Sequence, residues 1–260
     1  MSDSLTIDQL LAEALDAVRA GAAIALAPPV DLDVHMKTSR NDLVTAVDKA
    51  IEEEIAARLH SRTGLPLLGE EGHEVDSFAG RVWVLDPIDG TMNYVATHRD
   101  YAVSLALCED GVPIIGVVAD VVGGHTYHAI RGQGAWVDGT PLGLSPDAAS
   151  YREAIIITDI KEIIALPRLA AVLQDSRGHR RYGSAALECI EVAAGRAGAF
   201  VHMWVSPWDI AAASLIATEC GARATRLDAT PLDVRYKGSI LLGTPNVHAS
   251  LVQRLMSSVQ

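Results

Sequence analysis

The segment Asp86-Pro87-Ile88-Asp89-Gly90-Thr91-Met92-Asn93-Tyr94 places two carboxylates three residues apart, directly after the apolar run Val82-Trp83-Val84-Leu85. The length of that run and its content of β-branched residues predict a buried strand. Both aspartates therefore stand at the carboxyl end of a strand, which is where ligand crevices open in α/β sheets.

The backbone of this segment favours convergence of its oxygen atoms. Pro87 fixes its own φ and biases Asp86 toward an extended conformation, while Gly90 permits a tight bend and the close approach of a ligand. The carboxylates of Asp86 and Asp89 can then face one point, with the Ile88 carbonyl as a third oxygen. Hard oxygens in this arrangement suit Mg²⁺. The alternative is an ordinary surface turn, in which Asp-Pro and Asp-Gly are also common.

Two further acidic positions occur in similar settings. The run Leu65–Gly72 reads as a short strand that ends in the adjacent acids Glu70 and Glu71. Far downstream, Asp209 opens a helix expected over Asp209–Cys220. Taken alone, Asp209 could simply complement the helix dipole. Three acidic positions, each at the end of a strand or the start of a helix, together favour a metal site.

These motifs resemble the inositol monophosphatase family of Mg²⁺-dependent, lithium-sensitive phosphatases, and the similarity covers nearly the whole chain. The segments that carry it are Asn41–Lys49, Gly69–Gly72, Trp83–Tyr94, Arg131–Ala135, Tyr182–Ala186, Ala193–Gly195 and Pro207–Asp209. The nonapeptide Asp86–Tyr94 is a highly specific signature, whereas the downstream Trp-Asp is specific only together with it. The likeness is greatest to the bacterial, Gram-positive type, some members of which also remove phosphate from NADP.

The resemblance implies an α/β (α+β) fold, the layered αβαβα sandwich of the sugar-phosphatase type. We expect one compact catalytic unit with two subdomains, because Gly143–Arg152 is polar and rich in turn residues. Residues 1–144 would form an α+β subdomain with the main metal-binding motifs. Residues 145–260 would form an α/β subdomain that supplies Asp209 and substrate contacts.

Helices and strands alternate along the chain. The expected helices are one that follows the capping box Thr6–Gln9 and ends near Pro28, then Thr45–Arg62, Pro167–Gln174, Ser184–Gly195, Asp209–Cys220 and a closing helix from Asn246. The expected strands are Leu32–Lys37, Pro66–Gly69, Val82–Leu85, Tyr101–Cys108, Pro113–Asp120, His125–Ile130, Ala154–Thr158, Ala199–Met203 and Ser239–Gly243. The acidic run Glu52-Glu53-Glu54 is expected to be a solvated helix face.

The resemblance also assigns roles to individual residues. Two or three Mg²⁺ ions would be held by Glu70, Asp86, the carbonyl of Ile88, Asp89 and Asp209. One ion would generate and orient a hydroxide for in-line attack, and another would stabilise the leaving oxygen.

The water-activating group implied by the family is Thr91. With Glu70 or Glu71 behind it, its hydroxyl would orient or deprotonate the attacking water. The backbone amides of Gly90 and Thr91 would hold phosphate oxygens, and Asp48 would lie near the third ion. The expected substrate contacts are Asp48, Gly90, Thr91, Ser184, Ala185, His202 and Asp209, although Ser184 is also expected to cap the helix that follows it.

The choice of substrate is the point at which the chain departs from the family pattern. Seven residues before the Trp-Asp aspartate, many members carry a Glu that binds sugar hydroxyls, whereas this chain has His202. A carboxylate only accepts hydrogen bonds, but His can donate one and can be cationic. Inositol 1-phosphate is the first candidate substrate, and NADP(H), fructose 1,6-bisphosphate and histidinol phosphate are therefore alternatives. For His202, the alternative is a side chain that only packs. For the protein as a whole, the alternative is a non-catalytic sugar-phosphate-binding regulator.

Composition fits a soluble enzyme. The chain has 260 residues, 49% of them hydrophobic, and a net charge of −12, so it can bury a large core and its field repels nucleic acid. No apolar run is long enough to span a membrane. The widely spaced cysteines, three in number, indicate reduced thiols and a cytoplasmic protein. The basic cluster Arg177, Arg180 and Arg181 is either a solvated loop or a contact to a subunit or a distal phosphate. The resemblance implies a homodimer.

Overall fold

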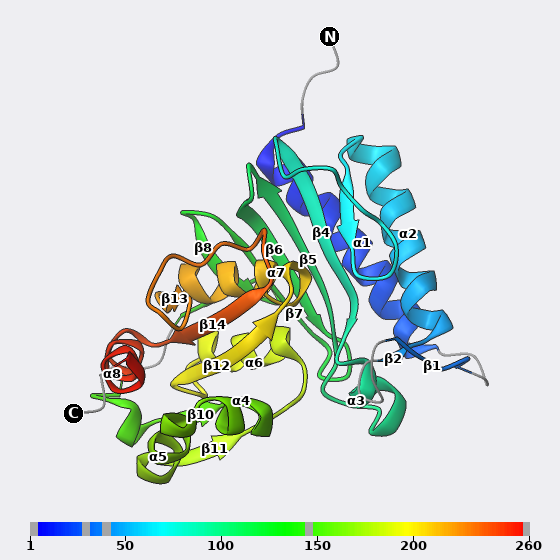
Figure 1. Cartoon of the computed structure of the whole chain (residues 1–260). Coiled ribbons are helices and arrows are strands. Elements are labelled where there is room, and N and C mark those ends of the chain that lie inside the picture. Colours follow the sequence, from blue (N-terminus) through cyan, green and yellow to red (C-terminus); the bar gives the residue numbers. More distant parts are fainter. Residues whose placement is uncertain (1–4, 28–31, 38–42, 144–147, 257–260) are drawn as a thin grey trace.

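The computed structural model describes residues 5–27, 32–37, 43–143 and 148–256. Two sheets alternate with three layers of helices (Figure 1), which is the αβαβα architecture expected. Helices α1 (Ile7–Leu26) and α2 (Ala46–Thr63) cover the outer face of the first sheet. Helices α6 (Ala185–Ala193) and α7 (Pro207–Glu219) lie between the sheets. The outer layer of the second sheet consists of α4 (Ile160–Ala165), α5 (Pro167–Asp175) and α8 (Pro245–Met256).

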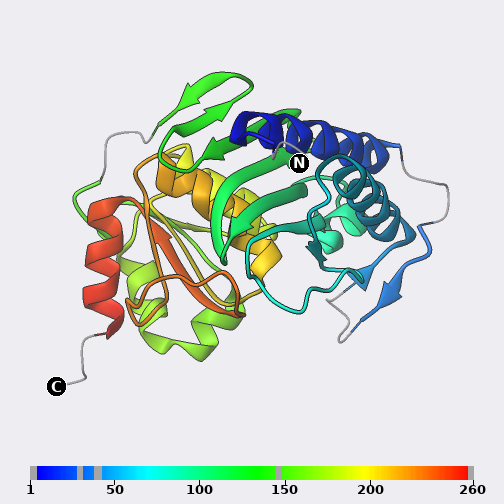
Figure 2. The ribbon, with the colours of Figure 1, turned by 90° about the horizontal axis from the view of Figure 1, so that it is seen from above.

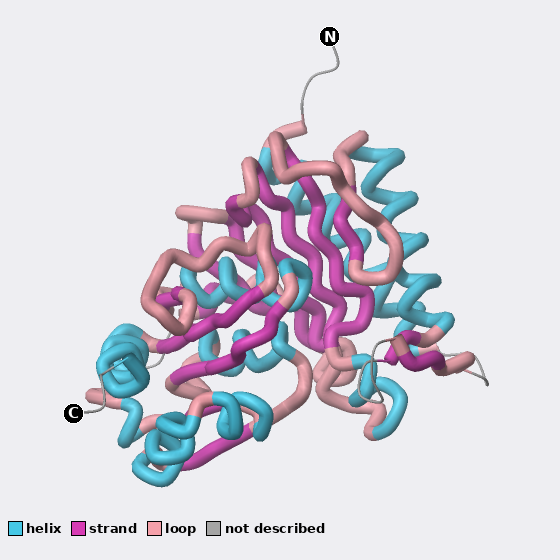
Figure 3. Tube along the Cα trace, viewed as in Figure 1, coloured by secondary structure: helices cyan, strands magenta, loops and turns pink. Residues whose placement is uncertain are grey.

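The two sheets, whose strands are shown in Figure 3, differ in their number of strands and in how many neighbouring strands are parallel. The seven-stranded sheet has the order β3 (Leu67–Gly69), β4 (Arg81–Asp89), β5 (Ala102–Glu109), β6 (Val112–Asp120), β7 (His125–Ile130), β8 (Gly134–Val137) and β9 (Thr140–Leu142). Only β3 and β4 in it are parallel. The five-stranded sheet has the order β11 (Gly178–Arg180), β10 (Ile155–Ile157), β12 (Ala199–Val205), β14 (Gly238–Gly243) and β13 (Arg223–Thr225). A small pair is formed by β1 (His35–Met36) and β2 (Leu43–Val44).

Strand residues alternate between neighbouring layers of the core. In β4, Trp83 packs among the side chains of the α1–α2 layer, whereas Val84 faces α6 and α7. In β12, Phe200 faces the middle layer and Val201 faces the outer helices. Both sheets are therefore covered on both faces, which explains why their central strands are apolar runs without polar alternation.

Helix α7 lies close to β6 because a glycine opposes it. A Cβ on Gly116 would lie 2.6 Å from the carbonyl oxygen of Ala212. A side chain at residue 116 would push the helix away from the sheet, and with it the first turn that carries Asp209. Figure 2, viewed from above, shows α7 packed along the sheet between the outer helices.

Most expected elements form, with ends shifted by a few residues. The strand expected over Leu32–Lys37 is only two residues long, at His35–Met36. Elements that were not expected are β2, the short α3 (Thr91–Ala96), α4, β8, β9, β11, β13 and the 3-10 helix Tyr151–Glu153. Their apolar runs are too short to show a period. The helix expected to end near Pro28 ends at Leu26, and the subdomain boundary expected at 144 and 145 lies outside the described residues.

None of the helices that the structure describes combines the length and apolar character needed to cross a bilayer. All three cysteines are free thiols, and Cys108 and Cys189 are buried.

Candidate active site

A β-bulge at the end of β4 turns both central aspartates toward the same region. Asp86 pairs with Ser104 and Asp89 with Ala102, so β4 contains one residue more than β5 between these pairs. The extra residue falls where Pro87 can donate no ladder hydrogen bond. In a regular strand, residues three apart face opposite sides of the sheet. The bulge removes that alternation, and the charge of Asp89 raises the pKa of Asp86.

Asp86 is one of the buried carboxylates of this region. It is 2% exposed, and its Oδ1 atom has no hydrogen-bond partner among the described residues. Burial raises its pKa well above the usual range, and the charges of Glu70, Asp89, Asp209 and Asp48 raise it further. Acids from four separate parts of the chain therefore act on one buried carboxyl group.

Asp89 is held by the amino end of α6. The Ser184 hydroxyl donates to it at 2.6 Å, and the amides of Ala185 and Ala186 donate at 3.2 and 2.6 Å. Burial nevertheless raises the pKa of Asp89 to about 6, although these hydrogen bonds oppose the shift. Ser184 also accepts from the amide of Leu187, so it caps α6 as expected. Both Ser184 and Ala185 thus contact Asp89, and their contact with substrate stays a prediction.

Asp209 reaches the same cluster from the first turn of α7. The helix begins at Pro207, and the amide of Ser206 donates to the Asp209 carboxylate at 2.6 Å in a capping box. Burial raises the pKa of Asp209 well above its usual range, and the charge of Asp89 adds to the effect. The cap thus aims a carboxylate of the middle layer at the end of β4.

Glu70 and Glu71 share a lysine. The Lys37 ammonium lies 2.8 Å from Glu70 Oε1 and also donates to Glu71. Burial alone would lower the pKa of Lys37, but the charges and hydrogen bonds of both glutamates outweigh burial and raise it. Burial raises the pKa of Glu71 to about 7 despite the lysine. A protein cation therefore offsets part of the negative charge at this side of the cluster.

Glu52 corrects the expectation of a solvated face at Glu52-Glu53-Glu54. It is 2% exposed, and its carboxylate accepts hydrogen bonds from the amides of Glu71 (2.8 Å) and His73 (3.0 Å). A Cβ on Gly69 would lie 2.4 Å from that carboxyl group. The loop that carries Glu70 closes over Glu52, and its amides compensate the burial of the charge.

The hydroxyl of Thr91 has a different carboxylate neighbour from the one expected. It lies 3.1 Å from the carbonyl oxygen of Ile88 and 3.3 Å from Asp48 Oδ1, whereas Glu70 and Glu71 contact Lys37. Asp48 is buried, and its carboxylate also accepts the amide of Thr45 at 2.8 Å in the capping box of α2. One proton cannot serve both acceptors at once, so the Thr91 hydroxyl can exchange partners.

Gly90 leads from β4 into α3 with a left-handed backbone, at a φ of 96°. A Cβ there would lie 3.1 Å from the carbonyl oxygen of Asp100 and 3.2 Å from that of Gly183. Both the conformation and the close approach therefore require glycine.

A pocket of about 170 Å³ opens beside these carboxylates. It is lined by Asp89, Asp159, Arg181, Gly183, Ala185, Glu188, His202, Val205 and Asp209. Arg181 enters it from the basic cluster and pairs with Asp159 at 2.5 Å. The guanidinium of Arg181 and the imidazole of His202 line the pocket together with Asp89 and Asp209. The pocket therefore offers hydrogen-bond donors beside the acidic side chains.

His202 presents a donor in either protonation state. The amide of Trp204 donates to its Nδ1 atom at 3.1 Å, which places the hydrogen of a neutral ring on Nε2. In the cation, both nitrogens carry hydrogen, and Nδ1 can face Glu162 Oε1, 3.4 Å away. Burial lowers the pKa of His202, while the charges of Glu162 and Asp159 act in the opposite direction.

Sequence reasoning missed several residues that shape the site. Glu162, on the unexpected α4, is fully buried and accepts the amide of Met203 at 3.2 Å. Lys37 was assigned only to a strand. A charged residue inside an apolar run, as in Ile160-Lys161-Glu162-Ile163-Ile164, was the one available signal for Glu162.

The carboxylate oxygens of this cluster suit a divalent cation, although the side chains do not converge on a single point. Within the described ranges, no three His, Cys, Asp or Glu side chains already surround a common position as metal ligands do. The buried Asp86 Oδ1 without a partner and the mutually raised carboxyl pKa values nevertheless fit a hard cation. A bound cation would compensate both the orphaned oxygen and the repulsion.

Comparison with known proteins agrees with this geometry. Residues 7–260 match the Inositol monophosphatase family. The inositol-1-monophosphatase of Bacillus subtilis (strain 168) is 36% identical over 245 residues, which are 91% of this chain and 92% of that protein. The chain belongs to the inositol monophosphatase family. It is therefore a phosphatase, a hydrolase of phosphate esters.

Solved structures of the inositol monophosphatase fold are similar throughout. Inositol monophosphatase-II from Staphylococcus aureus MSSA476 has a TM-score of 0.85 at 35% identity, and 95% of each chain is covered. An IMPase/NADP phosphatase complexed with NADP and Ca²⁺ has a TM-score of 0.90 at 27% identity, covering 98% of this chain and 97% of that chain.

The raised carboxyl pKa values predict how the stability of this inositol monophosphatase relative depends on pH. A carboxyl with a higher pKa in the folded state stabilises the fold at low pH, and that contribution is lost as pH rises through the folded pKa. This loss begins near the unfolded pKa, about 4, and is complete above the folded pKa, about 6 for Asp89 and about 7 for Glu71. Mg²⁺ binds the deprotonated form, so we expect it to raise the free energy of unfolding more at pH 8 than at pH 6. The difference should be at least about 1.4 kcal/mol, equivalent to one pKa unit.

Thermal unfolding in EDTA and in Mg²⁺ at both pH values measures this difference. Asp86→Asn, which removes one titrating ligand candidate, serves as the comparison and should shrink it. An equal stabilisation by Mg²⁺ at pH 6 and pH 8 would contradict the prediction.

Proposed function

We propose that this phosphatase is a Mg²⁺-dependent phosphomonoesterase that hydrolyses small sugar or polyol phosphates, with inositol 1-phosphate as its reference substrate. The observation that carries the proposal is the buried Asp86, whose unpartnered oxygen lies among other carboxylates at the end of β4. A non-catalytic sugar-phosphate-binding regulator would not need this costly arrangement.

The ions would be held by Glu70, Asp86, the carbonyl of Ile88, Asp89 and Asp209, and we propose two or three of them. Bound Mg²⁺ would supply charge neutralisation for the phosphate and a water of lowered pKa. A related IMPase/NADP phosphatase, 28% identical to this chain, was solved with Mg²⁺ and phosphate, which supports the choice of ion. Glu71 and Lys37 would adjust the charge beside Glu70.

The chain itself would position the attacking water. The Thr91 hydroxyl can accept a hydrogen bond from water while it donates to Asp48, which lies 3.3 Å away. Asp48 is fixed in turn by Thr45 at the start of α2. This chain of contacts gives Thr91 a proton acceptor, and the amides of Gly90 and Thr91 would hold the phosphate oxygens as α3 begins.

We propose two classes of substrate for this pocket. A polyol phosphate is supported by the related Staphylococcal structure with bound inositol monophosphate, at 32% identity. A 2′-phosphorylated adenine nucleotide, such as NADP(H), is favoured by the donors of His202 and Arg181 in the pocket. Related structures were solved with 2′-AMP at 33% identity and with NADP. Fructose 1,6-bisphosphate and histidinol phosphate are further candidates, because the same hydrogen-bond donors of His202 and Arg181 could bind them.

We further propose a cytoplasmic homodimer that lithium inhibits. The lithium proposal is supported by a related Staphylococcal structure described as an inhibitory complex from a LiCl soak. The small, singly charged Li⁺ would replace Mg²⁺ among the same oxygens without supplying its charge.

Phosphate release tests the function directly. The purified protein should release phosphate, with Mg²⁺ and not with EDTA, from one or more of inositol 1-phosphate, NADP, 2′-AMP, fructose 1,6-bisphosphate and histidinol phosphate. Absence of release from all five would favour the regulator.

Substitution of the central carboxylates should weaken the metal site. Asp86→Asn and Asp209→Asn each remove a negative charge and should raise the Mg²⁺ concentration for half-maximal activity. We expect turnover to fall by at least about 10–100-fold, the loss typical of more remote metal-site changes. Steady-state rates over a Mg²⁺ titration measure both effects. Asp228→Asn, on an exposed loop, is the matched control. Near-normal kinetics in either variant would remove that residue from the site.

Removal of the Thr91 hydroxyl should slow catalysis without loss of binding. We expect Thr91→Ala to lower kcat by about 10²–10⁴-fold, as for a lost acid–base contact, with little change in KM. Thr91→Ser should recover much of the rate because it restores the hydroxyl. Asp48→Asn should lower kcat in the same way if the carboxylate accepts the proton. An unchanged kcat in Thr91→Ala would reduce the hydroxyl to a structural role.

Replacement of His202 should change the preference between substrates. His202→Glu turns a donor into an acceptor, so kcat/KM for inositol 1-phosphate should rise relative to NADP by about tenfold, or about 1.4 kcal/mol. His202→Gln, which can still donate, should stay near the native ratio. The ratios are compared at pH 6 and pH 8, because an imidazolium favours anionic esters at the lower pH. If the ratio of kcat/KM for inositol 1-phosphate to that for NADP is unchanged in His202→Glu, His202 only packs and does not contact the substrate.

A further inference from the structure

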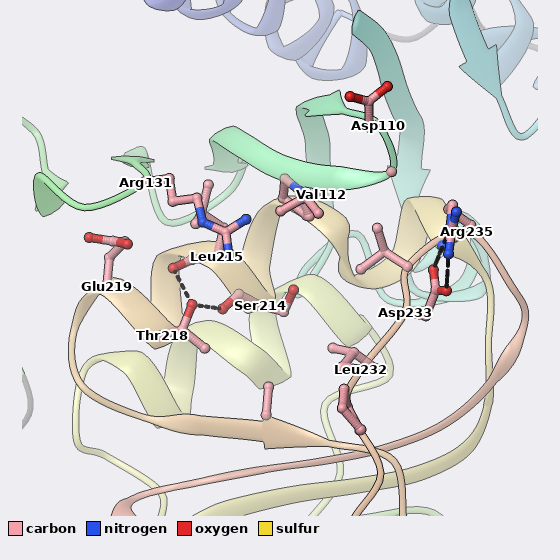
Figure 4. Close-up of a pocket in the computed structure, with 15 residues that line it drawn as sticks. Asp110, Val112, Arg131, Ser214, Leu215, Thr218, Glu219, Leu232, Asp233 and Arg235 are labelled. Carbon is pink, nitrogen blue, oxygen red and sulfur yellow. Dashed lines mark hydrogen bonds and ion pairs between the residues drawn. The ribbon is translucent and has the colours of Figure 1, made fainter. Parts of the chain in front are cut away.

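A second and larger cavity, of about 600 Å³, lies away from the carboxylate cluster. Its walls come from the β5–β6 turn, the carboxyl-terminal half of α7 and the segment Pro231–Arg235 that precedes β14 (Figure 4). Residues 110–131 of the first sheet thus face residues 214–235 of the second half of the chain. Cavities of about 300–1,000 Å³ between such units are the usual setting for small-molecule sites.

The floor of this cavity is apolar. Leu215 and Val234 are buried there, and Leu232 and Pro113 are partly buried beside them. The polar side chains of α7 turn back to their own helix. Ser214 donates to the carbonyl of Ala211, and Thr218 donates to those of Ser214 and Leu215. The cavity therefore offers an apolar surface to an occupant, with little polar competition from the helix.

The acidic side chains around the cavity are already engaged. Glu219 accepts the amides of Gly132 and Gly134 at 2.8 and 2.9 Å. Asp110 accepts the amide of Gly80 at 2.8 Å. The remaining acid, Asp233, forms a two-point ion pair with Arg235 at the rim, and Figure 4 shows that pair. These contacts compensate the negative charges of the cavity.

Arg131 is the cation that remains. Its side chain forms no hydrogen bond or ion pair with any residue that the structure describes. Figure 4 shows it extending from the end of β7 over α7, among the side chains that line the cavity. Arg131 is exposed, so its guanidinium is open to a ligand from solvent, and a planar guanidinium beside an apolar floor is suited to a carboxylate or phosphate group on an apolar body.

We propose that this cavity is a second binding site, which takes a small amphipathic anion. The anionic group would pair with Arg131, and the apolar body would lie against Leu215, Leu232 and Val234.

Two of the three walls of the cavity are connected to Asp209. Helix α7 carries Asp209 in its first turn and lines the cavity from Ser214 to Glu219. The segment Pro231–Arg235 leads to Lys237, whose ammonium lies 5.5 Å from the centre of the Trp208 ring, next to Asp209. An occupant that moves either wall would shift a proposed metal ligand. Occupancy should therefore change the Mg²⁺ requirement, and this coupling, unlike the binding itself, rests on the proposed function.

Binding of 1-anilinonaphthalene-8-sulfonate, an apolar aromatic body with one fixed negative charge, tests the site. Fluorescence and calorimetry on the full chain should show one saturable site, from which octanoate displaces the probe. Arg131→Ala should weaken binding by about tenfold or more, the range for a lost charged hydrogen bond. Leu232→Glu should abolish it by placing a carboxylate on the apolar floor. Arg254→Ala, at an exposed arginine of α8, should leave it unchanged.

Three results would overturn the site. They are an absence of saturable binding, equal binding by Arg131→Ala and wild type at equal melting temperature, and complete, competitive displacement of the probe by Mg²⁺ with inorganic phosphate, because coupling between two separate sites would only shift the affinity for the probe. The last result would place the probe in the carboxylate pocket.

The coupling is tested separately through the Mg²⁺ titration of phosphate release. Octanoate should change the half-saturating Mg²⁺ concentration by about twofold or more in wild type and not in Arg131→Ala. An identical titration with and without octanoate would overturn the coupling. A protein without phosphatase activity would fail the proposed function while the binding measurements still decide the cavity.

Discussion

Mutual repulsion among buried carboxylates is the constraint on which the rest of this structure depends. Asp86 and Asp89 are buried and Asp209 is partly buried, and loss of hydration raises the pKa of all three. Such a cluster is unfavourable unless donors or cations compensate it. The amino end of α6 and the amide of Ser206 supply part of that compensation, and the ammonium of Lys37 offsets the charge of the neighbouring Glu70. The unpartnered oxygen of Asp86 marks where it is incomplete, and a bound cation would complete it.

The three layers around this cluster serve to bring its parts together. The bulge at Pro87 points the end of β4 toward the middle layer, and α6 and α7 meet it with their amino ends. Gly116 lets α7 lie against the sheet. Because helix amino ends carry unsatisfied amides, they stabilise carboxylates as well as phosphates, and the same amides that hold Asp89 would favour an anionic substrate nearby.

The sequence indicated which acidic residues come together better than it indicated their contacts. The acidic positions and the cap at Ser184 could be read from motifs and apolar runs, and the layered fold was implied by the family resemblance. The neighbour of Thr91 could not, because Asp48 comes from a helix cap 43 residues earlier. The burial of Glu52 was likewise hidden, since its compensating donors are the amides of a loop about 20 residues away. Residues such as Glu162 belong to an element too short to show a period.

By itself, the sequence determined that two aspartates stand at the end of a buried strand, which helices begin with capping residues, and which runs are apolar enough for the two sheets. These are local properties of spacing, propensity and burial. Only the tertiary structure decided that Asp89 meets Ser184, 95 residues away, that the His202 ring presents its Nε2 hydrogen, and that Arg131 faces an apolar cavity. Such contacts arise from how whole layers pack, and packing joins residues whose separation along the chain carries no signal of their meeting.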